Sequence, residues 1–354
     1  MSRTIYHIIP SFHPVIGGAE RQLERLARVQ RETGKHVKII TRNLDSKDLL
    51  PRDFKNIEII RLNSINMFFF NVLLFLFFFK NFNQIKFVHV HSCSSVMFTS
   101  FFCSFFLNFK AFIKITRIGS GSQLELIKNN FFKRSLFNLF KNNKKIKFIA
   151  LTDEAKDYFL NFFNGFSINV IPNGIDVSKF QIIEIKETIN IIFISRLISR
   201  KNVFNSVKII HESFKFNYNV AICGKGSEYL KIKNYIKNNT LSNINLFGEL
   251  NEFEIFNHLS KSHFFILNSI NEGLSNAFLE AISSGVIPVV SENEFYVKLN
   301  LKYDCLLFFD DFIKFSKNEL IKVYNIKSKN LKLMLNKDFN IINIAKKLDD
   351  LYAS

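Results

Sequence analysis

Two acidic residues, Glu272 and Glu280, are separated by seven residues within the segment from Asn271 to Val290. Ser275, between them, is suited to cap a helix because its hydroxyl can accept a hydrogen bond from a backbone N–H of the first turn. The apolar residues that follow have helical spacing, and Gly285 is suited to the left-handed position that ends many helices. A polar loop that enters a helix N-terminus presents N–H groups to an anion. The segment predicts an anion-binding loop flanked by carboxylates; an ordinary helix N-terminus remains the open alternative.

Two cations stand in a second loop. Arg196 directly follows a strand-like apolar run and begins the loop, and Lys201 lies near the end of the loop, at the start of a helical stretch. An arginine can grip a phosphate with two parallel hydrogen bonds, and a lysine adds a point charge, so the pair could neutralise a diphosphate. Surface cations at the ends of a strand and a helix are the alternative.

Two glycine-containing loops complete the candidate site. Gly17-Gly18 opens an expected helix, where missing side chains let a ligand approach the backbone closely, and Gly224-Lys225-Gly226 follows another strand. Tight turns without a ligand explain both loops equally well. Neither the dinucleotide fingerprint GxGxxG nor the phosphate loop GxxxxGK[ST] occurs, so no nicotinamide enzyme is implied.

Apolar strand-like runs alternate with helical stretches along the chain, which predicts an α/β protein with parallel sheets covered on both faces. The expected strands are Thr4–Pro10, His36–Thr41, Ile57–Leu62, Phe87–His91, Phe112–Thr116, Phe148–Thr152, Asn169–Ile171, Ile189–Ser195, Asn219–Cys223, Ile244–Phe247, Phe264–Leu267, Val286–Val290 and Cys305–Phe308. Helices expected in the first half are Gly18–Thr33, Asn66–Asn81, Ser94–Leu107 and Thr152–Phe163. Ligands of open parallel sheets bind beyond the carboxyl ends of strands. The candidate loops all follow strands: Pro10–Ala19, Arg196–Asn202, Gly224–Ser227 and Asn268–Ser275.

A length of 354 residues favours two domains. The turn Pro172-Asn173-Gly174 is the clearest break, and a new strand begins near Ile189. We therefore expect a first domain at residues 1–175, a second at 189–325 and a helical tail at 326–354.

The chain carries 48 Lys and Arg against 30 Asp and Glu, a net charge of +18 that favours anionic partners. No RNA-binding module or helix-turn-helix pattern accompanies the charge, so nucleic acid is not expected as a partner. Phenylalanine is abundant, with 44 residues and no Trp, and a general bias toward Phe, Ile, Asn and Lys explains it as a substitute for Leu.

The cysteines predict a reducing compartment. They show no metal spacing and lie in apolar stretches, so we expect buried free thiols at Cys93, Cys103, Cys223 and Cys305. The N-terminus has no apolar signal core of adequate length, which favours a cytoplasmic location.

One apolar run, Met67 to Phe79, has 13 residues, short of the roughly 20 needed to span a bilayer. Two interpretations remain open: a buried helix, or a face that dips into an anionic membrane interface beside Lys80, Lys86 and Lys110. The second would place the protein at the inner face of the cytoplasmic membrane.

Taken in order, these motifs resemble glycosyltransferase family 4, a set of retaining enzymes with the GT-B fold. The resemblance covers nearly the whole chain and rests most on the segment from Glu272 to Glu280. It implies two Rossmann-like, doubly wound domains that face each other across a cleft, with a nucleotide-diphosphate sugar bound mainly by the second. The other matching segments are Gly17-Gly18-Ala19-Glu20-Arg21, Pro172-Asn173-Gly174-Ile175-Asp176, Ser195-Arg196-Leu197, Arg200-Lys201-Asn202 and Cys223-Gly224-Lys225-Gly226.

Matching the motifs residue by residue, the resemblance implies that Arg196 and Lys201 hold the donor diphosphate and that Glu272 lies by the transferred sugar. These three form the expected catalytic set, and Glu280 would bind the ribose hydroxyls. Further donor contacts would come from Gly17, Gly18, Gly224, Gly273, Leu274 and Ser275. No metal or other cofactor is expected, since cations and helix ends do that work and no DxD-type site occurs.

The chain departs from the family at one place. Members often carry a histidine after the strand that ends near Thr116, and none is present here. Arg117 or Ser120 would hold the sugar or the acceptor instead, and Asn173 is a further acceptor-side candidate. His89 and His91 belong to a different strand and cannot simply replace the missing residue.

The resemblance implies transfer of a hexose or N-acetylhexosamine from a nucleotide-diphosphate sugar to a glycan acceptor. The family and the apolar, basic first domain favour a lipid-linked acceptor of bacterial surface polysaccharide synthesis, such as lipopolysaccharide, O-antigen or capsule. One alternative is a sugar-nucleotide 2-epimerase of the same fold. Another is a non-catalytic subunit of a polysaccharide assembly, which the retained Arg196, Lys201, Glu272 and Glu280 disfavour.

Overall fold

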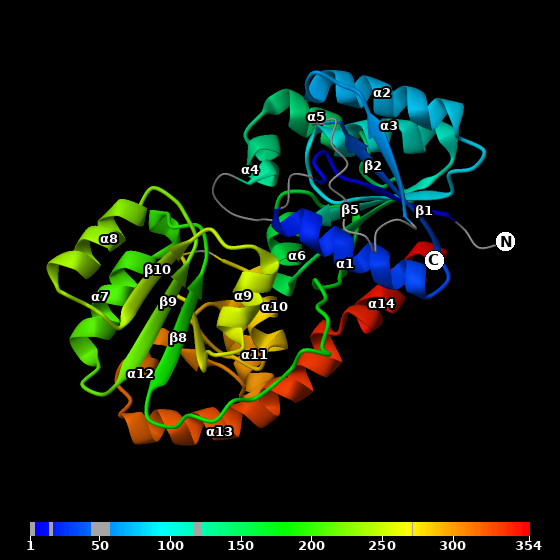
Figure 1. Cartoon of the computed structure of the whole chain (residues 1–354). Helices are drawn as coiled ribbons and strands as arrows, with labels where there is room; N and C mark the ends of the chain where they lie inside the picture. Colours follow the sequence, from blue (N-terminus) through cyan, green and yellow to red (C-terminus); the bar gives the residue numbers. More distant parts are fainter. Residues whose placement is uncertain (1–3, 14–16, 44–56, 117–121, 271) are drawn as a thin grey trace. The chain divides into compact units, whose positions relative to one another are not determined.

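The structure is a computed structural model that describes residues 4–13, 17–43, 57–116, 122–270 and 272–354. The chain forms two compact units: unit 1 contains Met1–Gly174 and Ile341–Ser354, and unit 2 contains Ile175–Asn340. Each unit is built on a parallel β-sheet with helices packed against it (Figure 1). The α/β class expected from the sequence is therefore confirmed.

Unit 1 contains a seven-stranded sheet in the order β3-β2-β1-β4-β5-β6-β7. The order reverses between β1 and β4, which pair in parallel. Its strands are β1 (Thr4–Ile8), β2 (His36–Arg42), β3 (Glu58–Leu62), β4 (Phe87–Val90), β5 (Lys110–Ile115), β6 (Ile146–Ala150) and β7 (Ser167–Val170). Its helices are α1 (Gly18–Glu32), α2 (Met67–Lys80), α3 (Ser95–Leu107), α4 (Gln123–Lys128), α5 (Phe131–Leu139), α6 (Asp153–Leu160) and α14 (Ile341–Ala353).

Unit 2 contains a six-stranded sheet in the order β10-β9-β8-β11-β12-β13, with the reversal between β8 and β11. Its strands are β8 (Ile189–Ile194), β9 (Tyr218–Cys223), β10 (Ile244–Gly248), β11 (Phe264–Leu267), β12 (Ile287–Val290) and β13 (Leu307–Phe308). Its helices are α7 (Val203–Ser213), α8 (Tyr229–Asn238), α9 (Glu252–Leu259), α10 (Asn276–Ser283), α11 (Glu294–Tyr303), α12 (Phe309–Phe312) and α13 (Lys317–Met334), with a 3₁₀ turn at Ser199–Lys201 and a π-helical turn at Leu335–Phe339.

Alternating side chains of the strands enter cores on opposite faces of the unit 1 sheet. In β1, Ile5 packs into the core beneath α1 and α14, whereas Tyr6 and Ile8 pack into the core beneath α2 and α3. This follows from the two-residue period of a strand, and burial on both faces explains why the strands are continuous apolar runs.

The C-terminal segment returns to unit 1. The helix α13 runs through residue 326, where we expected the tail to begin, and stays within unit 2. The following helix α14 packs on α1, with Ile344 and Leu348 buried beside Leu23 and Leu26 (Figure 1). The backbone passes from one unit to the other near Gly174, where an added Cβ would come within 2.7 Å of the Ile341 Cα.

The apolar helices α2 and α3 are buried only along one stripe. Phe70, Leu74 and Phe78 of α2 are fully buried, at the four-residue spacing of one helix face. Other apolar residues of α2, among them Phe68 and Leu76, are exposed. The interpretation of Met67 to Phe79 as a buried helix is thus correct for one face only. Within the described residues, no helix is both long and apolar enough to cross a bilayer.

Candidate functional site

The central contact of the candidate site joins two loops at the reversal of the unit 2 sheet. Lys201 ends the 3₁₀ turn that follows β8, and Glu272 lies in the loop that follows β11. The Lys201 Nζ donates a hydrogen bond to the Glu272 carboxylate, and the two side chains are only 11% and 15% exposed. Because β8 and β11 are neighbours in the sheet, the contact lies where open α/β sheets bind ligands.

Two further cations, Arg196 and Arg200, lie close enough to Lys201 to affect its charge. Burial lowers the pKa of Lys201 from its usual value; Glu272 raises it, and the nearby Arg200 and Arg196 lower it further. The Arg196 side chain is exposed directly after β8. After one cation pairs with Glu272, the loop keeps an excess of positive charge, which suits a diphosphate. Arg200 belongs to the matching segment Arg200-Lys201-Asn202, but it is not one of the diphosphate ligands expected from the sequence.

Residues that the sequence did not single out hold the Glu272 loop in place. The Asn293 side chain donates to the Glu272 carbonyl oxygen at 3.0 Å, and the Tyr296 hydroxyl donates to the Gly273 carbonyl oxygen at 3.2 Å. The Ile270 N–H donates to the Arg200 carbonyl oxygen at 2.9 Å, which ties the two loops together. Asn293 follows β12, so the rule that sites lie beyond strand ends could have found it.

Helix α10 begins beside the same loop. Ser275 caps it by accepting a hydrogen bond from the Phe278 N–H at 3.1 Å, and Gly285 follows its end with a φ of +82°, so both predictions are confirmed. Gly273 is exposed, and a Cβ added there would meet nothing within 4 Å. Glu280 is buried inside the helix, one turn further on.

The glycines of the Gly224–Gly226 loop allow two backbones to pack closely. A Cβ on Gly224 would lie 1.8 Å from the Ser195 carbonyl oxygen, and one on Gly226 would lie 2.2 Å from the Leu197 carbonyl oxygen. Both have positive φ values, +146° and +159°, which glycine tolerates best. These glycines thus shape the loop that carries Arg196. A direct contact between Gly224 and the donor stays a prediction.

In unit 1, Gly17 and Gly18 are both exposed at the start of α1. The Gly17 N–H donates to the Glu20 carboxylate at 3.0 Å, and the Ser11 hydroxyl donates to the other oxygen of the same carboxylate at 2.5 Å. Glu20 therefore holds the glycine turn from within its own helix as one half of a capping box.

The acceptor-side candidates have different outcomes. Arg117 and Ser120 lie outside the described residues. Asn173 is buried and lines a small cavity of unit 1, with room for about one water molecule, together with His89 and Lys114. Burial lowers the pKa of Lys114 to about 8. No sequence pattern indicates this buried lysine, because it occupies an apolar position of β5.

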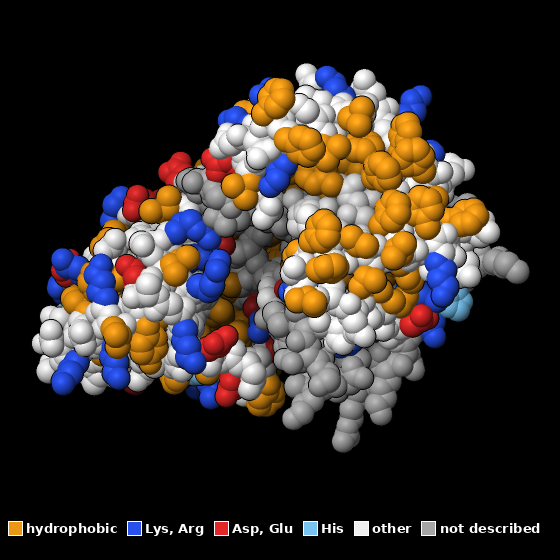
Figure 2. Space-filling model, turned by 90° about the horizontal axis from the view of Figure 1, so that it is seen from above, with side chains coloured by type: hydrophobic (Ala, Val, Ile, Leu, Met, Phe, Trp, Pro, Cys, Tyr) orange, Lys and Arg blue, Asp and Glu red, His pale blue; other side chains and the backbone are white. Residues whose placement is uncertain are grey.

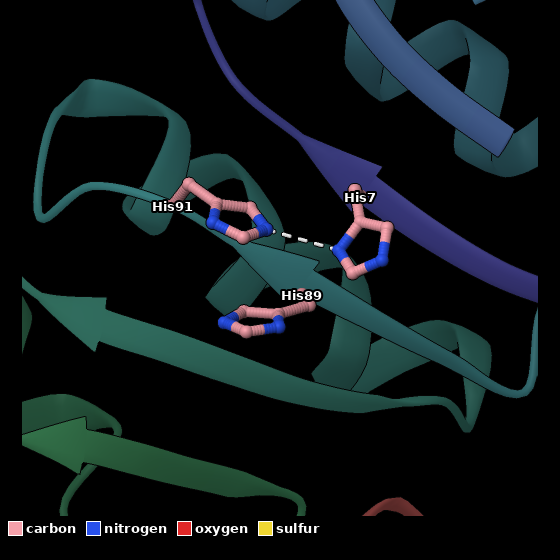
Figure 3. Close-up of side chains that lie close together, drawn as sticks. All are labelled: His7, His89 and His91. Carbon is pink, nitrogen blue, oxygen red and sulfur yellow. Dashed lines mark hydrogen bonds between the residues drawn. The ribbon is translucent and has the colours of Figure 1, made fainter. Parts of the chain in front are cut away.

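Three buried histidines meet at the reversal of the unit 1 sheet (Figure 3). His7 lies on β1, His89 lies on β4, and His91 directly follows β4. Burial lowers the pKa of His7 to about 4, and burial with the neighbouring imidazoles lowers the pKa of His89 and His91 well below the usual range. All three rings are therefore neutral at neutral pH. Because His89 and His91 are fully buried, neither is positioned on the surface to replace the missing histidine near Thr116.

A hydrogen-bond chain sets the ring tautomers. The Gln30 amide nitrogen donates to the Asp349 carboxylate at 2.9 Å, so the Gln30 oxygen faces His7 and accepts from its Nε2–H at 2.8 Å. The His7 Nδ1 then accepts from the His91 Nε2–H at 2.9 Å. The three rings offer nitrogens within 4.8 Å of one another, a spacing that a metal could use. The nearby positive charge of Lys114, which also lowers these pKa values, disfavours a cation there.

Two parallel sheets with central reversals, and a cationic loop with a helix N-terminus at the second reversal, define a two-unit α/β protein of the Rossmann type. Residues 16–179 match the family described as Glycosyltransferase Family 4, and residues 175–334 match Glycosyl transferases group 1. The protein belongs to this glycosyltransferase family.

The chain is also similar to proteins of known activity or structure. It is 30% identical over 240 residues to the UDP-Gal:alpha-D-GlcNAc-diphosphoundecaprenol alpha-1,3-galactosyltransferase of Escherichia coli, a match that covers 58% of this chain and 59% of that protein. Sucrose-phosphate synthase of Thermosynechococcus elongatus has a TM-score of 0.77 at 14% identity, over 99% of this chain and 98% of the other. HepE of Anabaena, solved in complex with UDP-glucose, has a TM-score of 0.72 at 14% identity, over 99% of both chains. These likenesses establish the GT-B-like fold.

Proposed function

We propose that the protein is a retaining glycosyltransferase that moves a hexose or N-acetylhexosamine from a nucleotide-diphosphate sugar to a lipid-linked glycan acceptor. The observation that carries the proposal is the Lys201–Glu272 pair at the reversal of the unit 2 sheet, with Arg196 and Arg200 beside it. Cations suit the diphosphate, and a carboxylate suits the hydroxyls of a sugar.

The proposed reaction needs no protein nucleophile. The acceptor hydroxyl oxygen bonds to the anomeric carbon on the face from which the diphosphate leaves. The bond between the anomeric carbon and the diphosphate oxygen breaks, its electron pair stays on that oxygen, and the oxygen takes the acceptor proton. Arg196, Lys201 and the backbone N–H groups near residues 273–275 stabilise the leaving oxygen most strongly when its charge is greatest.

The two acidic residues have separate proposed roles. Glu272 lies in the loop and would bind the transferred sugar, exchanging its contact with Lys201 for sugar hydroxyls. Glu280 lies inside α10, where the Ser283 and Ser284 hydroxyls donate to its backbone carbonyl oxygen at 2.9 and 3.0 Å. Its side chain would accept hydrogen bonds from the ribose.

Two relatives support the choice of substrates. The galactosyltransferase of Escherichia coli is named for a UDP-galactose donor and a diphosphoundecaprenol-linked acceptor, and HepE was solved with UDP-glucose. By analogy, we propose a UDP-sugar donor and a polyprenyl-diphosphate-linked glycan acceptor of bacterial surface polysaccharide synthesis, used at the inner face of the cytoplasmic membrane.

A donor screen followed by a transfer assay tests the proposal. UDP and UDP-sugars should raise the melting temperature of the wild-type protein, because a ligand that binds only the folded state stabilises it. The stabilising UDP-sugar should then label a polyprenyl-diphosphate-linked acceptor with retained anomeric configuration. Arg196→Ala and Lys201→Ala should lose transfer at least about a hundredfold and weaken UDP binding. Lys208→Ala changes an exposed lysine of α7 and serves as the control.

Three results would contradict the proposal. If Arg196→Ala and Lys201→Ala keep full turnover, the diphosphate assignment is wrong. If the protein converts a UDP-sugar to its 2-epimer without any acceptor, the protein is an epimerase of this fold. If no nucleotide or nucleotide-sugar shifts the melting temperature, a non-catalytic role is favoured.

A further inference from the structure

The surface formed by α2, α3 and the turn after α2 exposes an unusual number of aromatic side chains. Phe105 and Phe106 of α3 are each 60% exposed, although they are among the most apolar side chains of the molecule. Figure 2 shows hydrophobic side chains gathered over unit 1. We call this surface the phenylalanine face; its exposed residues are Phe68, Phe69, Val72, Leu76, Phe79, Phe82, Phe102, Phe105 and Phe106.

The phenylalanine face is continuous from one helix to the other. The ring of Phe75 lies 4.5 Å from that of Phe79 on α2 and 6.0 Å from that of Phe102 on α3. Phe102 in turn contacts Phe106 at 4.8 Å, and Phe106 contacts Phe105 at 5.2 Å. A connected apolar patch on an otherwise polar surface marks an interaction site, unlike apolar residues scattered singly.

The chain segment that contains this surface carries almost only positive charge. Residues 59–152, which contain α2 to α5, carry thirteen Lys and Arg and a single acidic residue, Glu125. Their net charge of +12 is two thirds of the +18 of the whole chain. At α5, exposed Phe131 and Phe132 stand directly before the exposed cations Lys133 and Arg134.

We propose that the phenylalanine face docks on the interface of an anionic lipid bilayer, with its rings among the upper acyl chains and the cations at the lipid phosphates. A second copy of the chain fits the face poorly, because two surfaces of strong positive charge would be pressed together. The helix α2 has 14 residues, whereas a helix that spans a bilayer needs roughly 20. We therefore propose that α2 docks on the bilayer surface and does not cross it. The inference deepens the proposed function, since it supplies the membrane at which a lipid-linked acceptor is reached.

Vesicle binding by the full chain tests the inference. The wild-type protein should co-sediment with phosphatidylglycerol-containing vesicles at low salt and release as salt is raised. Phe105→Ser combined with Phe106→Ser should weaken this binding at least about tenfold, since it removes two exposed rings and no fully buried one. Lys133→Glu combined with Arg134→Glu should weaken it by a similar factor, and only on anionic vesicles. The matched control is Phe253→Ser with Leu301→Ser, which removes two exposed apolar side chains of unit 2 and should bind like wild type.

Several results of these vesicle experiments would contradict membrane docking by the phenylalanine face. Absence of binding at low salt, equal loss in the unit 2 control, or full binding by the Phe105 and Phe106 variant would overturn the inference. So would a dimer in solution that this variant dissociates, because a second copy would then occupy the face. UDP-induced stabilisation is measured on the same samples. If vesicles bind and UDP does not, the proposed function fails and the docking surface stands; the reverse result overturns only the docking surface.

Discussion

The substitution Glu272→Gln should have opposite effects on donor binding and on sugar transfer. In this structure Glu272 is paired with Lys201, the lysine proposed to bind the donor diphosphate. The two side chains form an ion pair and are only 11% and 15% exposed. Glutamine keeps the size of the side chain and removes its charge. A free diphosphate would then meet an uncompensated Lys201 next to Arg196 and Arg200.

The expected gain is estimated from the general strength of an ion pair. Two unit charges about 4 Å apart interact by about 4 kcal/mol at an effective dielectric constant of about 20. Desolvation and rearrangement cancel most of this, as they do in measured ion pairs, and leave about 1 kcal/mol. UDP should therefore bind Glu272→Gln about fivefold more tightly than wild type. Transfer should fall by about a hundredfold or more, because the variant loses the carboxylate proposed to bind the transferred sugar.

Isothermal titration with UDP, at several salt concentrations, measures the first effect, and turnover of the cognate UDP-sugar measures the second. The control is Glu294→Gln, which removes an exposed carboxylate of α11 paired with Lys298. It should change neither quantity. Weaker UDP binding by Glu272→Gln would show that the carboxylate supports the diphosphate site and does not compete with it. Unchanged transfer would remove Glu272 from the catalytic set.

Three further predictions concern stability and loop shape. Burial lowers the pKa of Lys114 from 10.5 to about 8, so the unfolded chain binds this proton more tightly than the folded protein does. Below pH 8 the free energy of unfolding is therefore about 3 kcal/mol lower than it would be with a neutral Lys114. Lys114→Met should raise the melting temperature at pH 7 in calorimetry, and the gain should shrink as pH rises from 8 toward 10.5; a gain independent of pH would contradict this. Gly226→Ala should destabilise unit 2 by more than about 2 kcal/mol in urea titration, because its Cβ would lie 2.2 Å from the Leu197 carbonyl oxygen, and a neutral result would show that the loops can separate. Ser275→Ala should cost about 1 kcal/mol in the same titration through loss of the α10 cap, whereas Ser275→Asn should cost little.

The strands were predictable because helices cover both faces of a parallel sheet. Each strand is therefore a short, nearly continuous apolar run, such as Ile189–Ile194. Each of the thirteen expected runs overlaps one strand of the structure, although several boundaries differ by one or two residues. Helices α4 and α5 were not expected, since Gln123–Lys128 and Phe131–Leu139 are short and follow one another closely.

The loops of the candidate site were predictable one by one, but the contact between them was not. Strand ends indicated the loops of Lys201 and Glu272, but their contact joins residues 71 positions apart and follows from β8 and β11 being neighbours. The histidine network was not predictable for a similar reason. It requires α14 to return to unit 1, where Asp349 orients Gln30 and thereby His7, and no local pattern encodes that return.

The abundant phenylalanines occupy mainly two kinds of position, the buried cores and the exposed faces of helices in unit 1. A general bias toward Phe, Ile, Asn and Lys explains rings in the cores, such as the buried rings of Phe148 and Phe159. The same bias acts on unit 2, yet the exposed positions of α8 are mostly Lys and Asn. The exposed positions of α2 are mostly Phe, Val and Leu. A helix that is apolar all around needs cover on its outer side as well as its inner side. A composition bias shared by both units cannot produce this difference, so it favours a function for the outer face of α2, and a lipid surface fits its chemistry.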